Sequence, residues 1–255
     1  MLISLWKTWK QIKTINFMTY TRKKLVVLSG AGISAESGIR TFRDSGGLWE
    51  DHDILDVASP MGWQKNPALV LEFYNQRRKQ ALNAQPNDGH KALAHLEKFF
   101  DVTIITQNVD NLHEKAGSTN VIHLHGELFK ARSTADPNLV YELKDWQLNL
   151  GDKCEKGSQL RPHIVWFYEE VPMMEVAVQE AMQADIFIVV GTSLVVYPAA
   201  GLIDYVAREV PKYVIDIEKP NINLHRYHNL TFIQEKASVG LTRLSEELIQ
   251  KFAFF

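Results

Sequence analysis

Short runs of apolar, often β-branched residues alternate along the 255-residue chain with longer amphipathic stretches. The predicted strands are 24–28, 102–106, 121–124, 186–190, 213–217 and, more weakly, 231–234. The run Ile-Phe-Ile-Val-Val at 186–190 has no polar position, which is typical of a strand that is buried on both faces, as in a parallel sheet.

The stretches between these strands predict helices at 67–83, 88–99, 173–183, 198–209 and 238–252. Asn66 and Pro67 suit the N-cap and first turn of a helix, and Asp88 is predicted to cap the next helix. Strands that alternate with helices predict an α/β fold with a Rossmann-like, doubly wound parallel sheet. Such a sheet binds ligands at the carboxyl ends of its strands.

One region interrupts this alternation. Residues 127–161 are polar and have no clear period, so they predict a small inserted module at about 127–165 instead of a further unit of the main sheet. We expect a second helical part of this small domain at about 35–83, within a large domain that covers 21–255.

The first 20 residues are predicted to be a separate extension. Apolar residues recur there at roughly helical spacing, with lysines between them: Leu5, Trp6, Trp9, Ile12 and Ile15. This pattern fits an amphipathic membrane-surface or targeting segment. The alternative is that Met18 is the real start and that the extension is not native or is poorly ordered. The direct passage from Met18 into the first strand favours this alternative.

Composition narrows the possible functions. A formal charge of −2, with 45% hydrophobic and 23% charged residues, is ordinary for a globular protein and gives no reason to expect nucleic-acid binding. No apolar run is long enough to span a bilayer. The single cysteine, Cys154, excludes an internal disulfide and a four-cysteine metal site, and fits the cytoplasm, where we expect the protein.

Glycines follow the first strand. Gly30 and Gly32 lie at a strand-to-helix turn, where glycine lets the backbone N–H groups approach a pyrophosphate. These residues alone fit a tight structural turn equally well. The continuation through Phe42, Arg43 and Trp49 is more specific than the glycines.

Polar side chains follow the second strand. Gln107, Asn108 and Asp110 are placed to bind ribose hydroxyls and a carboxamide at the carboxyl end of the sheet. The alternative is an Asn/Asp-rich turn in which Asp110 caps the next helix. Two further polar segments, 191–193 and 216–218, also lie at the ends of predicted strands, where a dinucleotide would cross the sheet.

Two histidines end the third strand. His125 stands next to Gly126, and an imidazole there can accept a proton from a ribose hydroxyl near neutral pH. The alternative is one more packed or exposed histidine among the nine of the chain. His123 shares the strand face with His125, but no third metal ligand is evident nearby.

Five motifs in order, GAGISAESGIRTFR, QNVD, HLHG, RPHIVWF and GTSL, closely resemble the sirtuins, the NAD-dependent protein deacylases. The similarity runs from about residue 24 to the C-terminus, and the order and distances of the motifs make it specific. The resemblance implies a Rossmann-type NAD domain with a small inserted domain, and a substrate held between the two.

The resemblance also implies a reaction. NAD would be consumed as a co-substrate, and the acyl group of an acylated lysine side chain of a protein would pass to ADP-ribose with release of nicotinamide. His125 would be the catalytic base that deprotonates a ribose hydroxyl. Val165 and Phe167 would bind the substrate. The NAD-binding positions carried over are Gly30, Ala31, Gly32, Ser34, Ala35, Glu36, Phe42, Arg43, Trp49, Gln107, Asn108, Val109, Asp110, Gly191, Thr192, Ser193, Asp216, Ile217, Glu218 and Ala237.

A further pair concerns the acyl group. Tyr74 and Arg77 resemble the Tyr-x-x-Arg pair of the desuccinylase and demalonylase branch. Positions i and i+3 share a helix face, so a phenol and a planar guanidinium can converge on one carboxylate. The alternative is a basic, solvated helix face that Arg78 and Lys79 continue.

The chain departs from the family at three places. Many sirtuins hold zinc with two Cys-x-x-Cys pairs in the inserted module, where this chain has Ser133 and only Cys154, so we expect no zinc. Tyr168 stands where the family usually has glycine, and it either narrows the peptide cleft or points to solvent. Asp216 replaces a frequent asparagine and cannot donate a hydrogen bond when ionised.

Two other functions remain open at this point. The same fold could serve ADP-ribosyl transfer or NAD hydrolysis, against which the Tyr74 and Arg77 pair argues. A non-catalytic NAD-binding module is the other alternative, and His125, Asn108 and Asp110 argue against it.

Overall fold

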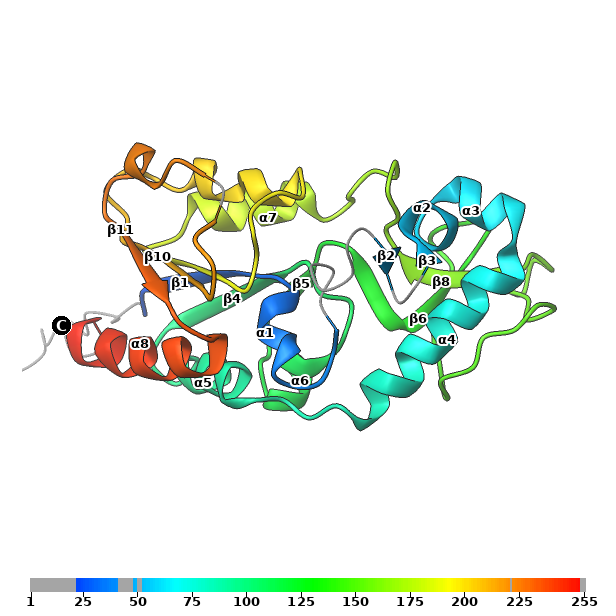
Figure 1. The fold of residues 1–255 in the computed structure, drawn as a ribbon, viewed down its shortest axis with the longest axis horizontal. Coiled ribbons are helices and arrows are strands. Elements are labelled where there is room, and N and C mark those ends of the chain that lie inside the picture. Colours follow the sequence, from blue (N-terminus) through cyan, green and yellow to red (C-terminus); the bar gives the residue numbers. More distant parts are fainter. Residues whose placement is uncertain (1–21, 41–47, 50–51, 221, 253–255) are drawn as a thin grey trace, which may run out of the picture.

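The computed structural model describes residues 22–40, 48–49, 52–220 and 222–252, so the predicted N-terminal extension lies outside the described residues. A six-stranded sheet with the order β11-β10-β9-β1-β4-β5 forms the centre of the molecule (Figure 1). Every neighbouring pair in it is parallel. The strands are β1 (Lys24–Ser29), β4 (Asp101–Thr106), β5 (Val121–His123), β9 (Ile186–Val190), β10 (Lys212–Asp216) and β11 (Leu230–Gln234).

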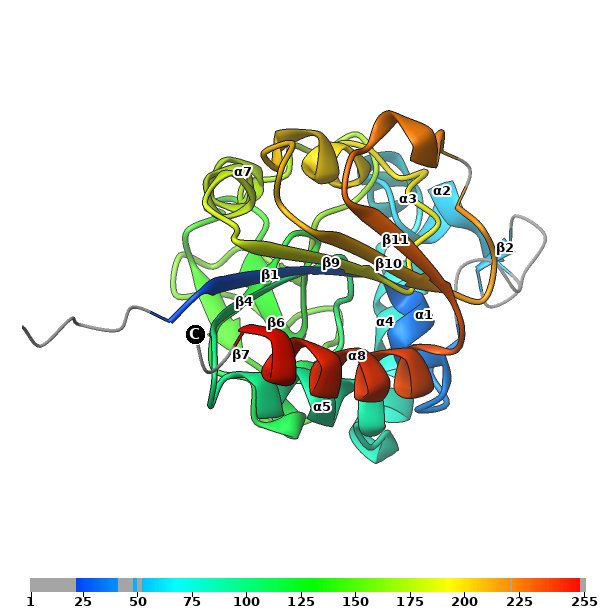
Figure 2. The ribbon, with the colours of Figure 1, turned by 90° about the vertical axis from the view of Figure 1, so that its left-hand side faces the viewer.

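Helices cover both faces of this sheet (Figure 2). On one face α5 (Asp88–Leu96) and α8 (Ala237–Phe252) pack against β1, β4 and β9. On the other face lie α7 (Met174–Met182) and the 3₁₀ helix η2 (Ala199–Tyr205). The predicted α/β fold with a doubly wound parallel sheet is therefore confirmed, and all five residues of β9 are buried, as the continuous apolar run predicts.

The strand order places the site. The chain runs from β1 outward to β4 and β5, and then returns to build β9, β10 and β11 on the other side of β1. The order thus reverses between β1 and β9, and ligands of such sheets bind at the carboxyl ends of the strands beside this reversal. Two short helices begin at this edge, α1 (Ala31–Ala35) and α6 (Leu112–Ala116).

A separate, smaller region lies beyond one end of the main sheet (Figure 1). It contains an antiparallel sheet with the order β7-β6-β8 and a group of helices packed beside it. Its elements are β2 (Leu48–Trp49), β3 (His52–Asp53), α2 (Ile54–Val57), α3 (Pro60–Lys65), α4 (Pro67–Asn83), β6 (Gly126–Ser133), β7 (Val140–Glu142) and β8 (Leu160–Ile164).

The eight-residue strand β6 lies in the region that showed no period in the sequence. Its burial alternates at first and then shifts by one position, because the pairing with β8 changes register between Gly126 and Ala131. A strand with such an irregularity does not keep one apolar side, so the period of two is lost. The boundaries of the inserted module remain a prediction.

Two details of the predicted helices are wrong. Asn87, and not Asp88, is the N-cap of α5, because its side chain in an extended backbone accepts a hydrogen bond from the Gly89 N–H at 2.9 Å. The helix predicted at 198–209 is the shorter 3₁₀ helix η2, in which Gly201 lowers helix propensity and which ends where Val206 becomes extended. The predicted cap of α4 is confirmed, since Asn66 accepts a hydrogen bond from the Leu69 N–H.

Among the described residues, none of the helices combines the length and the apolar character that crossing a bilayer requires.

Candidate active site

Three glycines let two strand ends touch at the carboxyl edge of the sheet. The Gly32 N–H donates to the Gly191 carbonyl at 2.8 Å, and Gly191 itself has a φ of 63°. A Cβ on Gly32 would lie 2.7 Å from the Gly191 Cα, and one on Gly30 would lie 2.7 Å from the Gly191 oxygen. Glycine is thus required here by backbone packing inside the protein, and this packing sets the shape of the turn that carries Ala31 and Ala35.

Side chains from two strand ends form a buried hydrogen-bonded group beside this turn. Ser34 on α1 donates to an Asp110 carboxylate oxygen at 3.0 Å. The Asn108 amide donates to both the Ser34 hydroxyl and the Gly30 carbonyl, each at 3.1 Å. The structure therefore brings together four predicted positions that are up to 80 residues apart in the sequence.

Asp110 has a double role. Its second carboxylate oxygen accepts from the Leu112 N–H at the start of α6, but the N-cap of this helix is Asn111, so Asp110 supports the turn before the helix and does not cap it. Burial raises the pKa of the Asp110 carboxyl, and the hydrogen bonds from Leu112 and Ser34 offset this only in part. A buried carboxylate with a raised pKa is characteristic of functional sites.

A second link crosses from β4 to β9. The Gln107 side chain donates to the Thr192 hydroxyl at 3.1 Å, and Thr192 is buried while the adjoining Ser193 is half-buried. Val109 is also tied down, because its carbonyl accepts from the Leu128 N–H at 2.7 Å. The polar segments after β4 and β9 therefore face each other, as expected for neighbours of the central strand β1.

The two histidines of the third strand contact successive carbonyl groups of the loop after β4. His125 Nδ1 lies 3.0 Å from the Gln107 oxygen, and His123 Nδ1 lies 3.1 Å from the Asn108 oxygen. Burial lowers the pKa of His125, and its bond to the Gln107 carbonyl offsets this only in part. With Nδ1 donating to a carbonyl, His125 is a neutral imidazole whose Nε2 is an acceptor, and Nε2 has no hydrogen-bond partner within the described part of the chain.

The predicted adenosine-side positions lie at the ends of β10 and α8. Asp216 is buried and accepts from the Glu218 N–H at 3.1 Å, whereas Ile217 is 58% exposed. Ala237 packs in the core at the start of α8. Glu36 accepts two hydrogen bonds from Ser238, which gives it a structural contact with α8. NAD contacts by these residues remain predictions.

The predicted acyl-binding pair lies in the smaller region. Tyr74 is fully buried on α4, and its hydroxyl accepts from the Trp166 indole N–H at 3.1 Å. Burial raises the pKa of Tyr74 to about 12, so the phenol stays protonated. Arg77 is 9% exposed, and its charge acts on both Tyr74 and Asp110.

The alternative of a solvated basic face is wrong for this helix. Arg78 is fully buried and donates to the carbonyls of Trp146 and Leu128 and to the Asn75 side chain. A surface arginine would be hydrated, whereas this one joins α4 to the inserted sheet. Only Lys79 continues the helix as an exposed cation.

The predicted peptide-binding segment follows β8, and backbone hydrogen bonds to two other loops hold it in place. Val165 donates its N–H to the His125 carbonyl at 2.9 Å, and Phe167 donates to the Ala58 carbonyl at 3.0 Å. Phe167 is 41% exposed, and Tyr168 is 75% exposed with a φ of 70°. A left-handed backbone of this kind favours glycine, and Tyr168 carries a side chain there that is largely exposed to solvent.

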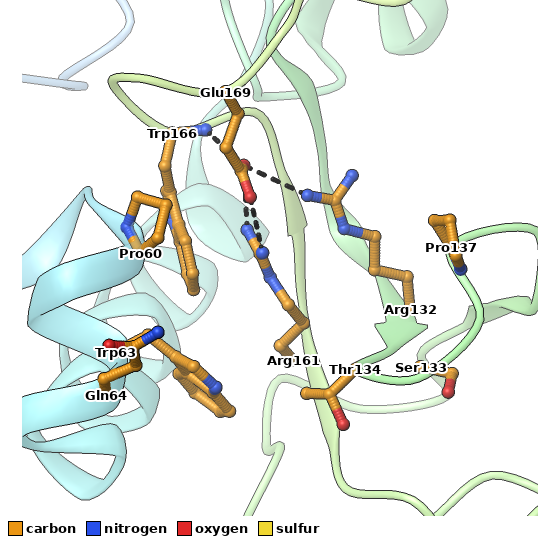
Figure 3. A pocket seen from close by; sticks show the side chains of 10 residues that line it. All are labelled: Pro60, Trp63, Gln64, Arg132, Ser133, Thr134, Pro137, Arg161, Trp166 and Glu169. Carbon is orange, nitrogen blue, oxygen red and sulfur yellow. Dashed lines mark hydrogen bonds and ion pairs between the residues drawn. The ribbon is translucent and has the colours of Figure 1, made fainter.

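A carboxylate holds this turn in place. Glu169 contacts Arg161 at 2.7 Å and Arg132 at 3.1 Å, and it accepts from the Trp166 N–H at 2.9 Å (Figure 3). Arg161 also stacks on the indole of Trp166, with 3.3 Å from its guanidinium carbon to the ring centroid. These groups line a cavity of about 380 Å³.

Ser133 and Cys154, which the resemblance places near the zinc-binding pairs of other sirtuins, lie close together. The Cys154 thiol lies 3.3 Å from the Ser133 hydroxyl, and both residues are buried. This hydrogen bond lowers the pKa of the thiol. Leu148 of the module is buried against Leu71 and Ala131.

Some predicted site residues cannot be placed, and some residues of the site were not predicted. Phe42 and Arg43 lie outside the described residues, as does the side chain of Trp49. Conversely, the sequence interpretation missed Glu114 and Glu169, each of which contacts a residue of a recognised motif. Neither glutamate could be recognised in the sequence, because each meets its partner only after the chain has folded.

Comparison with known proteins identifies the family. The model of the Sir2 family matches residues 30–198. An NAD-dependent protein deacylase of Helicobacter pylori is 55% identical over 230 residues, which cover 89% of this chain and 96% of that protein. A crystal structure of a Sir2 homolog–NAD complex shares 40% identity at a TM-score of 0.81 and covers 91% of both chains. The structure of Sir2 bound to acetylated peptide shares 27% identity at a TM-score of 0.73, over 90% of this chain and 93% of the other. The chain belongs to the Sir2 family.

Proposed function

We propose that the protein is a cytoplasmic NAD-dependent protein-lysine deacylase, in which His125 is the base. The observation that carries this proposal is the state of His125, a neutral imidazole fixed through Nδ1 with its Nε2 open at the carboxyl edge of the sheet. A base of this kind must accept a proton near neutral pH, and its lowered pKa keeps it unprotonated there.

The residues around His125 fit NAD. The amide of Asn108, the carboxyl of Asp110 and the hydroxyl of Ser34 form a polar group at the strand-order reversal, which suits ribose hydroxyls and a carboxamide. When bound, NAD supplies an electrophilic ribose carbon with nicotinamide as the leaving group. Gln107 and Thr192 would hold the part that crosses from β4 to β9.

We further propose a preference for acyl groups that end in a carboxylate, such as succinyl and malonyl, besides acetyl. Tyr74 remains a neutral hydroxyl donor and Arg77 is a buried cation on the same helix, so together they can receive one carboxylate. The burial of both residues supports this reading, since a charge removed from water favours an anionic partner.

Mass spectrometry of a peptide panel tests the activity. We expect NAD with acetyl-, malonyl- or succinyl-lysine peptides to yield nicotinamide, the free lysine peptide and acyl-ADP-ribose. Loss of NAD without change in the peptide would indicate an NAD hydrolase, and ADP-ribose on the unmodified peptide would indicate a transferase. No consumption of NAD would indicate a non-catalytic module.

The variant Arg77→Met tests the acyl preference. We expect it to lower kcat/KM for the succinyl peptide by about a hundredfold, the value of a charge-assisted contact of roughly 3 kcal/mol, and to leave acetyl turnover within a few-fold. Lys79→Met is the matched control, because it removes an exposed cation from the same helix. Equal losses on both peptides in Arg77→Met would contradict the assignment.

A further inference from the structure

His123 and His125 stand two residues apart, yet their rings have opposite surroundings. Each Nδ1 contacts a carbonyl of the loop after β4, at Asn108 and Gln107 respectively. The difference lies at Nε2, which in His123 is 2.7 Å from a carboxylate oxygen of Glu114 on α6. Only 9% of the His123 side chain is exposed, so water does not replace these partners.

The two partners of His123 fix its protonation. A backbone carbonyl oxygen and a carboxylate oxygen both accept hydrogen bonds and donate none. Both contacts are therefore hydrogen bonds only when each ring nitrogen carries a proton, and the ring is then an imidazolium.

The charged groups around the ring agree with this state. Glu114 on α6, Glu127 on β6 and Asp110 in the loop after β4 face His123, while His113 on α6 is the opposing basic group. Burial pulls the pKa of His123 down, but the hydrogen bond and charge of Glu114, with a smaller effect of Glu127, raise the pKa above its ordinary value. His113 is buried and its pKa is lowered, so it adds little positive charge.

We propose that His123 is a positioning residue that works as a cation at neutral pH, clamping the carbonyl of Asn108 to the carboxylate of Glu114 and thereby holding the NAD-binding loop in shape. This inference rests on the proposed function, because it assigns Asn108 to the NAD site. The Asn108 side chain has two further anchors, Gly30 and Ser34. The backbone of Asn108 must stay fixed for the side-chain bonds to Gly30 and Ser34 to form. The hydrogen bond from His123 holds the Asn108 carbonyl in place.

The hydrogen bond from His123 to the Asn108 carbonyl should be lost at high pH. Its contribution is complete below the ordinary histidine pKa and is lost as the pH rises through the raised pKa of His123. The single proton that remains then stays on Nε2 beside the carboxylate, and a ring lone pair faces the Asn108 carbonyl. His125 requires the reverse, because its lowered pKa keeps it neutral until the pH becomes acidic. The two histidines thus bracket the working pH range from opposite sides.

The variant Glu114→Gln separates charge from hydrogen bonding. A glutamine amide can donate to a neutral Nε2, which leaves the ring proton on Nδ1 for the Asn108 carbonyl. In the unmodified protein we expect the dissociation constant for NAD to rise about tenfold from neutral to alkaline pH, the effect of one lost hydrogen bond to a charged ring. In Glu114→Gln it should stay flat over the same range.

Glu127→Gln is the matched control. It removes a carboxylate that faces His123 without a hydrogen bond to it, since Glu127 pairs with Lys130 at 2.8 Å. We expect this variant to keep the alkaline loss of NAD affinity. An alkaline loss of equal size in Glu114→Gln and in the unmodified protein would overturn the proposal.

Two further measurements keep the test decisive if a variant folds poorly. Nitrogen-15 NMR of the unmodified protein should show both ring nitrogens of His123 protonated at neutral pH, and a neutral ring would overturn the proposal.

His123→Asn can retain the hydrogen bond to the Asn108 carbonyl that Nδ1 makes in histidine, whereas the longer side chain of His123→Gln can reach only Glu114. The asparagine variant should therefore bind NAD more tightly than the glutamine variant. The reverse order would also overturn it. These readouts need no turnover, so they stand apart from a failure of the deacylase proposal.

Discussion

The two regions of the molecule hold their functional residues in different ways. At the carboxyl edge of the six-stranded sheet, Asn108 and His125 are tied to backbone carbonyls of neighbouring strand ends. In the smaller region the half-buried and buried groups are charges, with Glu169 between Arg132 and Arg161 and Arg78 among carbonyls.

This difference predicts how each region responds to substitution. A hydrogen bond to a fixed backbone orients a side chain and contributes modestly to stability, so its loss should damage function more than folding. A charge cluster away from water must be complete, because removing one member leaves the others uncompensated. The first region should therefore lose activity, and the second should lose stability.

The largest effect is expected from His125→Ala. Removing the base should lower kcat/KM for acyl peptides by about three orders of magnitude, within the range of general base catalysis. The free energy of unfolding should change by less than about 1 kcal/mol, since within the described part of the chain the ring makes a single hydrogen bond, to the Gln107 carbonyl. Urea denaturation and peptide turnover measure the two quantities.

His95→Ala is the control for this variant, because His95 is an exposed histidine on α5 away from the site. It should retain activity. Full peptide turnover by His125→Ala would remove the basis of the proposed mechanism.

Glu169→Gln should show the opposite pattern. Neutralising the carboxylate leaves two arginines that are 11% and 13% exposed without their counter-charge, which costs about 3 kcal/mol in the free energy of unfolding. Glu170→Gln, at an exposed neighbouring position, is the control and should leave stability unchanged. Unchanged stability in Glu169→Gln would show that water, and not the carboxylate, solvates the arginines.

The main sheet could be predicted from the sequence because its cause is local. Continuous apolar runs such as β9 are buried on both faces, and all six predicted strands end within one residue of the observed bounds. The closeness of the polar residues after these strands can be predicted in the same way, since parallel strands bring their carboxyl ends to one edge of the sheet.

The smaller region could not be predicted in the same way, because its causes are distant in sequence. The register shift in β6 removes the period of two, and the partners that bury Arg78 lie about 50 and 68 residues away. Glu114 and His123 are nine residues apart on different elements, so their contact exists only once α6 packs beside β5. The Tyr74 and Arg77 pair was found through the family resemblance and helix spacing, not through hydropathy.

A smaller effect is expected at Tyr168. Its φ of 70° costs a side-chain-bearing residue about 1–2 kcal/mol, and its 75% exposed ring buries little surface in return. Tyr168→Gly should therefore raise the free energy of unfolding by about 0.5–1 kcal/mol, after the larger chain entropy of glycine is deducted. Tyr168→Ala removes the ring but keeps the strain, so it should not be stabilised. Equal gains in both variants would place the cost in the ring instead of the backbone.

The smallest effect is expected from metal chelation, because the sequence predicts no zinc in the inserted module. The module pairs Cys154 with Ser133 and buries Leu148 against Leu71 and Ala131. A thiol and a hydroxyl at 3.3 Å form a weak hydrogen bond that needs no metal, and the apolar contacts supply the cohesion. Prolonged treatment with a chelator should therefore leave both the melting temperature and peptide turnover unchanged, whereas a four-cysteine sirtuin treated in parallel should lose both. Stoichiometric zinc in the purified protein, together with a lower melting temperature after chelation, would mean that the module depends on a metal after all.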